Sequence, residues 1–205
     1  MLVSKSHGFL YIHVPRTGGT SIREALNPFS TRPSKSRFNK VISSLGLRPW
    51  AHRHFPVHTS FESARSSLPG TVFSSLFKFS FVRNPWARLA SDYVYKRENR
   101  GHRRHAETCR LGGFEAWLRQ EAGRKRSSQL AMLGQDIDFL GRFENLQLDF
   151  ETVCSRLGLG VSLEHRNSAQ KTPWEWRELY NSTCQQLVFD YWGKEIEDFD
   201  YAFES

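Results

Sequence analysis

The chain has few cysteines, and their spacing is not that of a metal site. Its three cysteines, Cys109, Cys154 and Cys184, are widely separated along 205 residues. They form no C-x-x-C pair and no cluster with histidine at the spacing of a zinc site, and their number is odd. The sequence therefore predicts free thiols and no bound metal.

Long apolar segments are also missing from the sequence. The first stretch, MLVSKSHGFLYIHV, holds only a brief apolar run that includes His13 and is too short and too polar for a signal segment. No later stretch approaches the roughly 20 apolar residues that a helix needs to span a membrane. We expect no transmembrane segment and a cytoplasmic location.

Acidic residues are fewer than basic ones. Lys plus Arg number 29 and Asp plus Glu number 21, which gives a net charge of +8. The excess is rich in arginine, whose planar guanidinium can bind an oxyanion at two points. Nucleic acid, a membrane surface and a phosphorylated or sulfated small molecule all agree with this charge, so composition predicts an acidic partner without identifying it.

What the sequence does contain is enough apolar material for a folded core. The hydrophobic fraction is 39%, with 16 Phe and 6 Trp, which argues against global disorder. A chain of this length fits one well-buried domain. We predict a single domain over residues 1–205.

Apolar runs alternate with helical patterns along the chain. Strands are predicted at residues 9–14, 77–82 and 138–143, and helices near 20–26, 60–68, 86–97, 114–120 and 144–157. The stretch 174–203 has helical periodicity as well, whereas 97–110 is typical of an exposed basic segment. The alternation predicts an α/β fold in which helices cover both faces of a parallel sheet.

The first chemical motif is PRTGGTS at residues 15–21, between a predicted strand and a predicted helix. Backbone N–H groups and the helix dipole can face an anion at such a turn. Gly18 and Gly19 allow the backbone to approach closely, and the other residues supply charge and hydroxyl groups: Arg16, Thr17, Thr20 and Ser21. No lysine precedes the hydroxyl pair, so an ordinary triphosphatase loop is not supported. The alternative is a plain glycine turn.

The second motif is RNPWARLASDY at residues 83–93. Arg83 lies at the end of a predicted strand, and Ser91 lies two helical turns further on. Arg83 could bind a phosphate at two points while Ser91 donates a hydroxyl, if both reach one oxyanion. The alternative is that Arg83 and Arg88 are surface or salt-bridged residues.

Together the two motifs resemble those of the sulfotransferases that use 3′-phosphoadenosine 5′-phosphosulfate (PAPS), specifically the carbohydrate-type branch, sulfotransferase family 2, with bacterial and Golgi members. That family's motifs resemble PKTGGTS and RNPxxRxxSxY. HRHFP at 52–56, DFLGRFENLQLDF at 138–150 and HRNSAQKTPWEWRELY at 165–180 look like its later blocks. The resemblance implies a fold like that of P-loop nucleotide-binding proteins. It also implies that residues 16–21 bind the 5′-phosphosulfate and that Arg83 and Ser91 bind the 3′-phosphate.

One departure from the family pattern concerns the first loop, which has Arg16 where lysine is commoner. Arginine keeps the positive charge, but its pKa is too high for it to donate a proton. We therefore assign Arg16 to electrostatic stabilisation of the leaving phosphate. Lys171 is a second candidate for phosphate charge, although a solvated loop lysine is nearly as good an interpretation.

Transfer to a hydroxyl also needs a base, for which histidine is suited near neutral pH. His52, His54 and His58 lie between the two motifs. We favour His54, because HFP resembles a family block in which a catalytic histidine is expected, and place His52 second. Glu144 is a carboxylate alternative, although it could pair with Arg142 instead.

The sequence thus predicts an enzyme that transfers a sulfuryl group from PAPS to an acceptor hydroxyl, without an essential metal. The resemblance suggests a carbohydrate acceptor, onto which aromatic side chains could stack if they are not part of the core: Trp174, Trp176 and Trp192. One rival is a kinase-like nucleotide-dependent phosphotransferase, which would need acidic residues to hold Mg²⁺. The other is a basic nucleic-acid-binding module, supported by RENRGHRRH at 97–105, but we expect no nucleic-acid partner.

Overall fold

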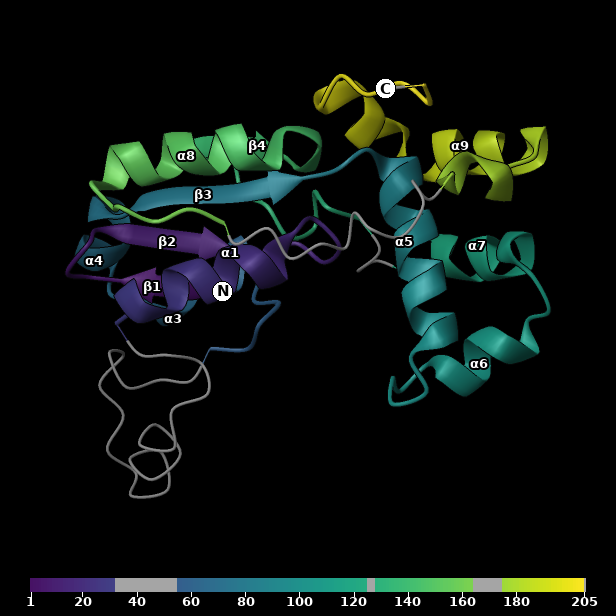
Figure 1. Cartoon of the computed structure of the whole chain (residues 1–205), viewed down its shortest axis with the longest axis horizontal. Coiled ribbons are helices and arrows are strands. Elements are labelled where there is room, and N and C mark those ends of the chain that lie inside the picture. Colours follow the sequence, from purple (N-terminus) through teal and green to yellow (C-terminus); the bar gives the residue numbers. More distant parts are fainter. Residues whose placement is uncertain (32–54, 125–127, 164–174, 205) are drawn as a thin grey trace. The chain divides into compact units, whose positions relative to one another are not determined.

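A computed structural model of the chain describes residues 1–31, 55–124, 128–163 and 175–204. The chain divides into two compact units. The first contains residues 1–82 and 132–166, and the second contains residues 83–131 and 167–205. The first unit holds the sheet, and the second is helical (Figure 1).

The sheet of the first unit has four strands in the order β1-β2-β3-β4. The strands are β1 (Leu2–Ser4), β2 (Phe9–Ile12), β3 (Phe77–Val82) and β4 (Phe139–Arg142). The last three pair in parallel, and β1 pairs antiparallel with β2. The predicted parallel sheet is confirmed for the three strands that the sequence indicated, while the short antiparallel β1 was not predicted.

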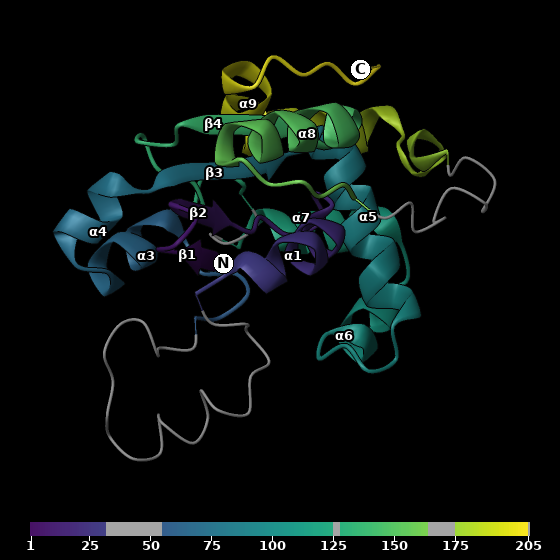
Figure 2. The same ribbon diagram turned by 60° about the vertical axis from the view of Figure 1, so that its left-hand side comes forward.

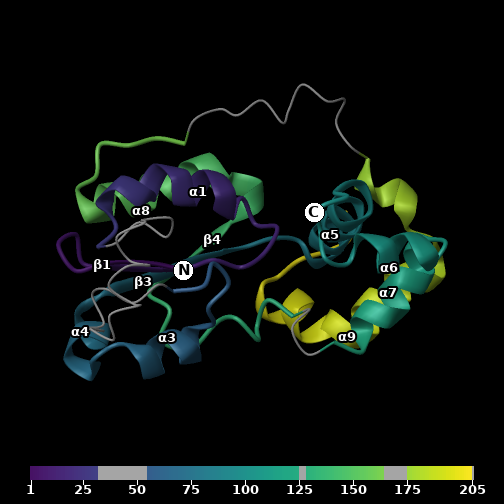
Figure 3. The same cartoon turned by 90° about the horizontal axis from the view of Figure 1, so that it is seen from below.

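Helices cover both faces of this sheet, as predicted. They are α1 (Gly19–Leu26), α3 (Phe61–Ser67), α4 (Gly70–Ser75) and α8 (Leu146–Leu157), with 3-10 turns η1 (Asn27–Phe29) and η4 (Phe143–Asn145). Figure 3 shows α1 and α8 on one side of the sheet and α3 and α4 on the other.

The two faces are built by the alternation of side chains along each strand. Phe9 and Tyr11 pack with residues of α1 and α8, whereas Leu10 and Ile12 pack with residues of α3 and α4. All four side chains are 0% exposed, and burying one large apolar side chain stabilises a fold by about 1.5–3 kcal/mol. The buried run of β2 therefore fixes where the chain after Ile12 leaves the sheet.

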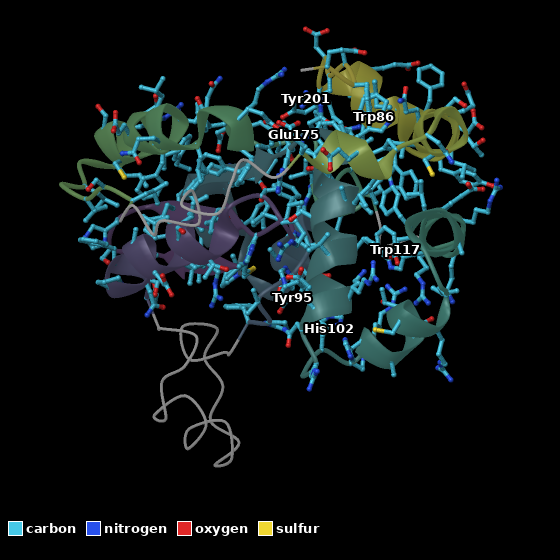
Figure 4. The ribbon with its side chains drawn as sticks, turned by 45° about the vertical axis from the view of Figure 1, so that its right-hand side comes forward. Trp86, Tyr95, His102, Trp117, Glu175 and Tyr201 are labelled. Atoms are coloured by element: carbon cyan, nitrogen blue, oxygen red, sulfur yellow. The ribbon has the colours of Figure 1, made fainter. Side chains whose placement is uncertain are left out.

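The second unit contains α5 (Pro85–Glu98), α6 (His105–Arg110), α7 (Phe114–Ala122), the 3-10 turn η6 (Trp176–Leu179) and α9 (Ser182–Asp198). Figure 2 shows α6 beside the C-terminal part of α5. Trp117 lies on the side of α7 that faces α5 (Figure 4) and is 0% exposed. Trp176 and Trp192 belong to the same apolar cluster, which favours core packing for both.

Residues 97–110 are not simply the exposed segment that was predicted. They include α6, and Arg104 is buried, with ion pairs to Glu107 and Glu121 at 2.9 and 2.8 Å. Glu121 also pairs with the buried Lys96 at 3.5 Å. The part of this segment that carries buried charges is stabilised by these contacts, because an unpaired buried charge is costly.

All three cysteines are free thiols, as predicted. Cys154 and Cys184 are buried, whereas Cys109 is exposed on α6. Among the helices in the described ranges, none has the length and apolar character needed to cross a membrane.

Candidate functional site

The first motif forms the turn between β2 and α1, and its backbone is unusual at two residues. Arg16 has φ +70° and Gly18 has φ +76°. Residues other than glycine rarely adopt a positive φ, so this backbone conformation costs about 1–2 kcal/mol at Arg16, whereas Gly18 adopts it without strain. Strained backbone of this kind is often found at ligand-binding turns. The loop is therefore held in one shape at an energetic cost.

Both glycines of the motif are required by their surroundings. A Cβ atom at Gly18 would lie 2.6 Å from Cδ2 of Leu146, in addition to the positive φ. A Cβ atom at Gly19 would lie 1.9 Å from Nε2 of His13. The first glycine is needed for its torsion angle and the second for close contact with a ring, so they are not interchangeable.

His13 is the residue against which Gly19 packs. It is 6% exposed, and its ring lies 4.6 Å from that of His58 and 6.0 Å from that of Tyr11, measured between centroids. Burial lowers the pKa of His13 from its usual value to about 2, and charges on His58 and Arg23 act in the same direction. His13 is therefore neutral at physiological pH and supports the loop by packing.

The hydroxyl groups of the loop differ in what they can do. Thr17 is 0% exposed, and its Oγ1 donates to the carbonyl oxygen of Val14 at 2.9 Å. Thr17 therefore stabilises the turn and cannot donate to a ligand while this bond is kept. Thr20 is exposed and Ser21 is half-buried, so their hydroxyls lie at the surface of the first turn of α1.

The first turn of α1 adds backbone donors to the same place. An α-helix leaves its first N–H groups without acceptors inside the helix, and here these belong to Gly19, Thr20 and Ser21. The half-buried Arg16 precedes them by a few residues. Positive charge and N–H groups at a helix start are the arrangement that binds phosphate or sulfate groups.

The second motif connects β3 to α5. Arg83 is half-buried and directly precedes Asn84, the N-cap residue of α5. The Asn84 side-chain oxygen accepts from the N–H groups of Trp86 and Ala87 at 3.0 and 3.2 Å, and its nitrogen donates to the carbonyl of Ala202 at 2.7 Å. The start of α5 is thus fixed next to Arg83.

Two further polar residues of α5 are buried. Ser91 is 8% exposed, and Arg88 is 4% exposed with its NH2 nitrogen 3.9 Å from Glu195. Arg88 is therefore a salt-bridged residue, which agrees with the alternative interpretation for that position. Of the anion-binding candidates in the second unit, Arg83 is the one at the helix start and Ser91 the one within the helix.

Several predicted site residues lie outside the described part of the chain: His52, His54 and Lys171. His58 is described and exposed, and its Nδ1 lies 3.1 Å from the carbonyl oxygen of His13, a distance suited to donation. Glu144 is exposed in η4. The described candidates are therefore residues 16–21 in the first unit and Arg83 and Ser91 in the second.

The sequence analysis missed three polar residues around Arg83. Asn84 could have been found, because an asparagine before a proline is a common helix start. Gln129 and Glu195, which are 0% and 1% exposed, have no local sequence signal. They lie 46 and 112 positions from Arg83 along the chain, and only folding brings them to it.

Comparisons with known proteins identify the family of the chain. A curated protein of Archaeoglobus fulgidus, described only as an uncharacterized protein, is 27% identical over 107 residues, which cover 50% of this chain and 84% of that protein. No solved structure matches the chain. The family model described as "Sulfotransferase family" matches residues 1–202. That match spans both motifs and both units, and it shows that the chain belongs to the sulfotransferase family.

Proposed function

We propose that the protein transfers a sulfuryl group from PAPS to a hydroxyl group of a carbohydrate acceptor. Family membership supports sulfuryl transfer in general. The observation that supports the PAPS assignment is the turn at residues 15–21. Gly18 is needed there for its torsion angle and Gly19 for its close contact with His13, and the turn leads into the start of α1, where an anion could bind. Both units contribute to one sulfotransferase domain over residues 1–205 in this proposal.

The proposed donor has anionic groups at two ends, and each unit contains residues that could hold one of them. In the first unit, the N–H groups at the start of α1, together with Arg16, Thr20 and Ser21, would hold the 5′-phosphosulfate. In the second unit, Arg83 and Ser91 would hold the 3′-phosphate, as the family motif implies. Thr17 has a supporting role, since its hydroxyl is bonded to Val14. Lys171 is a further candidate for phosphate charge.

PAPS, when bound, supplies the sulfuryl group and a phosphate leaving group. Arg16 would stabilise the negative charge that develops on the leaving oxygen, because arginine stays protonated at any pH at which the protein is folded. His54 would accept the proton of the acceptor hydroxyl, with His52 as second choice. No metal is needed in this scheme.

The acceptor is assigned by class only. The carbohydrate-type branch of the family suggests a sugar hydroxyl, and the net charge of +8 suits a glycan that is already acidic. Trp176 and Trp192 are not proposed as sugar-stacking residues, because both are buried in the core of the second unit.

Calorimetric titration of the purified protein with 3′-phosphoadenosine 5′-phosphate, the product of the donor, tests the proposal, with ATP as the comparison. We expect tight binding of the bisphosphate and weak binding of ATP. Equal affinity would contradict the proposal and favour a kinase-like activity, which magnesium dependence would then reveal.

Substitutions separate binding from chemistry. Arg16→Ala and Arg83→Ala should each weaken binding of the bisphosphate. His54→Ala should leave binding unchanged and abolish transfer, which an assay with radiolabelled PAPS measures. Retained transfer in His54→Ala would move the base to another residue.

A further inference from the structure

A side-chain amide holds the backbone of Arg83 at both of its hydrogen-bonding groups. The N–H of Arg83 donates to Oε1 of Gln129 at 3.0 Å, and Nε2 of Gln129 donates to the carbonyl oxygen of Arg83 at 2.9 Å. Gln129 lies in a bend after α7 and is 0% exposed. The residue that follows β3 is therefore paired in the way a neighbouring strand would pair it.

A buried carboxylate in turn holds Gln129. One oxygen of Glu195, on α9, accepts from the backbone N–H of Gln129, and the other accepts from its Nε2 at 2.9 Å. Glu195 is 1% exposed. Both side-chain protons of Gln129 are thus used, one toward Arg83 and one toward Glu195.

Glu195 also determines which way the amide of Gln129 points. The amide oxygen faces the N–H of Arg83, and the amide nitrogen faces two acceptors. A rotation of the amide by a half turn would place NH₂ against N–H and oxygen against two oxygens. The charge of Glu195 therefore enforces the orientation that pairs with Arg83.

Keeping a carboxylate in this position is costly unless its charge is compensated. Arg88 lies 3.9 Å from Glu195, and the side chains of both are at most 5% exposed. Apolar residues in such a place often stabilise a fold at least as well as a buried ion pair does. The arrangement is thus better suited to fixing a geometry than to adding stability.

We propose that Gln129 and Glu195 are positioning residues for Arg83, which hold its backbone so that the guanidinium is placed for the 3′-phosphate of the donor. This inference rests on the proposed function. Asn84 completes the arrangement, because it caps α5 at the next residue. Fixing the backbone on both sides reduces the conformational entropy that Arg83 loses when it binds a phosphate.

The test is a ratio of two affinities, since loss of folding would lower both. Calorimetric titrations with 3′-phosphoadenosine 5′-phosphate and with adenosine 5′-phosphate, which lacks the 3′-phosphate, measure how much that group contributes. In Gln129→Met the ratio should fall about tenfold, equivalent to about 1.4 kcal/mol, with little change for adenosine 5′-phosphate. In Glu195→Gln, a milder change of the same shape, it should fall about threefold.

Glu121→Gln is the matched control, because it removes another buried carboxylate of the second unit, which pairs with Lys96 and Arg104. We expect it to lower the melting temperature and to leave the ratio unchanged. In an Arg83→Ala background, Gln129→Met should not reduce the ratio further, because the residue that it positions is gone.

The outcomes distinguish this inference from the proposed function. If the unsubstituted protein shows no preference for the bisphosphate, the proposed function fails. If it shows the preference and Gln129→Met is folded with an unchanged ratio, only the positioning role is overturned. If Gln129→Met does not fold, Glu195→Gln decides: a lowered ratio supports the role, and a ratio equal to that of Glu121→Gln overturns it.

Discussion

The turns after β2 and after β3 both connect a buried strand to a helix, yet they are stabilised in different ways. The turn before α1 depends on its own backbone: two residues with positive φ and a glycine pressed against His13. The turn before α5 depends on side chains from elsewhere, since Gln129 pairs with Arg83 and Asn84 bonds to Ala202. Backbone conformation and close packing against His13 and Leu146 shape the first turn, whereas hydrogen bonds from distant residues hold the second.

This difference explains why the sequence predicts the first turn well and the second turn only in part. Glycine and hydroxyl residues in a short motif indicate the backbone conformation of that motif directly. The contact of a buried glutamine with a residue far away along the chain has no local sequence signal and is seen only in the folded structure. Substitutions in the first turn should therefore act mainly on local strain and packing.

The largest effect is expected for Gly19→Ala, which puts a methyl group into the ring of His13. Overpacking of this kind costs about 1–3 kcal/mol, and we also expect binding of the bisphosphate to be lost. Urea unfolding and calorimetry measure the two effects. Gly160→Ala, where the new atom meets nothing within 4 Å, is the control and should change stability by less than about 0.5 kcal/mol.

A double variant makes this prediction sharper. His13→Ala removes the ring that Gly19→Ala would strike, so the combined variant should lose less stability than the sum of the two single variants. Simple additivity would show that contact with His13 is not the reason for glycine at this position.

A smaller effect is expected for Gly18→Ala, with Gly112→Ala as its matched partner. Both glycines have φ +76°, but an added Cβ atom meets Leu146 at Gly18 and nothing at Gly112. The torsion alone costs about 1–2 kcal/mol, so both should be destabilised. Gly18→Ala should cost more and should weaken nucleotide binding, and equal costs with unchanged binding would contradict a special role for this turn.

The buried His13, beside the first turn, should make the free energy of unfolding depend on pH. Its pKa is about 2 in the folded chain, against the usual 6.5, so between these values the unfolded chain binds more protons. The free energy of unfolding should then fall as pH decreases below about 6.5, by up to about 1.4 kcal/mol per pH unit from this group. His13→Asn should flatten the slope measured by urea unfolding, and an unchanged slope would show that another group causes the dependence.

The smallest effect, and one of opposite sign, is expected for Arg16→Gly. Glycine adopts φ +70° without strain, so the substitution should raise stability by up to about 1 kcal/mol, less the entropy that glycine loses on folding. Binding of the bisphosphate should nevertheless weaken, as the charge is lost. Arg16→Lys keeps both charge and strain, and a gain in stability there would show that the torsion is not the cause.

The elements that the sequence predicted well are those with strong local signals. The apolar run FKFSFV matches β3 residue for residue, and α8 ends at Leu157, the predicted end, where Gly158 follows with φ +64°. The family resemblance, carried by two short motifs, is confirmed along nearly the whole chain. These features depend on neighbouring residues, which a single sequence contains in full.

The elements that were missed depend on context. β1 has three residues, too few for a clear period, and it pairs antiparallel with β2 at the edge of the sheet. The helix predicted near 60–68 is followed directly by a second helix, α4, which was not predicted; its N-cap residue is Pro69, and proline is suited to a helix start. Gln129 and Glu195 were missed because two polar residues far apart carry no period or motif.

The difference in exposure among the three cysteines has a practical use in labelling. The thiolate is the form of cysteine that attacks a thiol reagent, and burial raises the pKa of Cys154 to about 11 and also raises that of Cys184. Cys109 is exposed on α6. A maleimide dye should therefore attach at Cys109 without any change of sequence, and its fluorescence would report from the unit that carries Arg83.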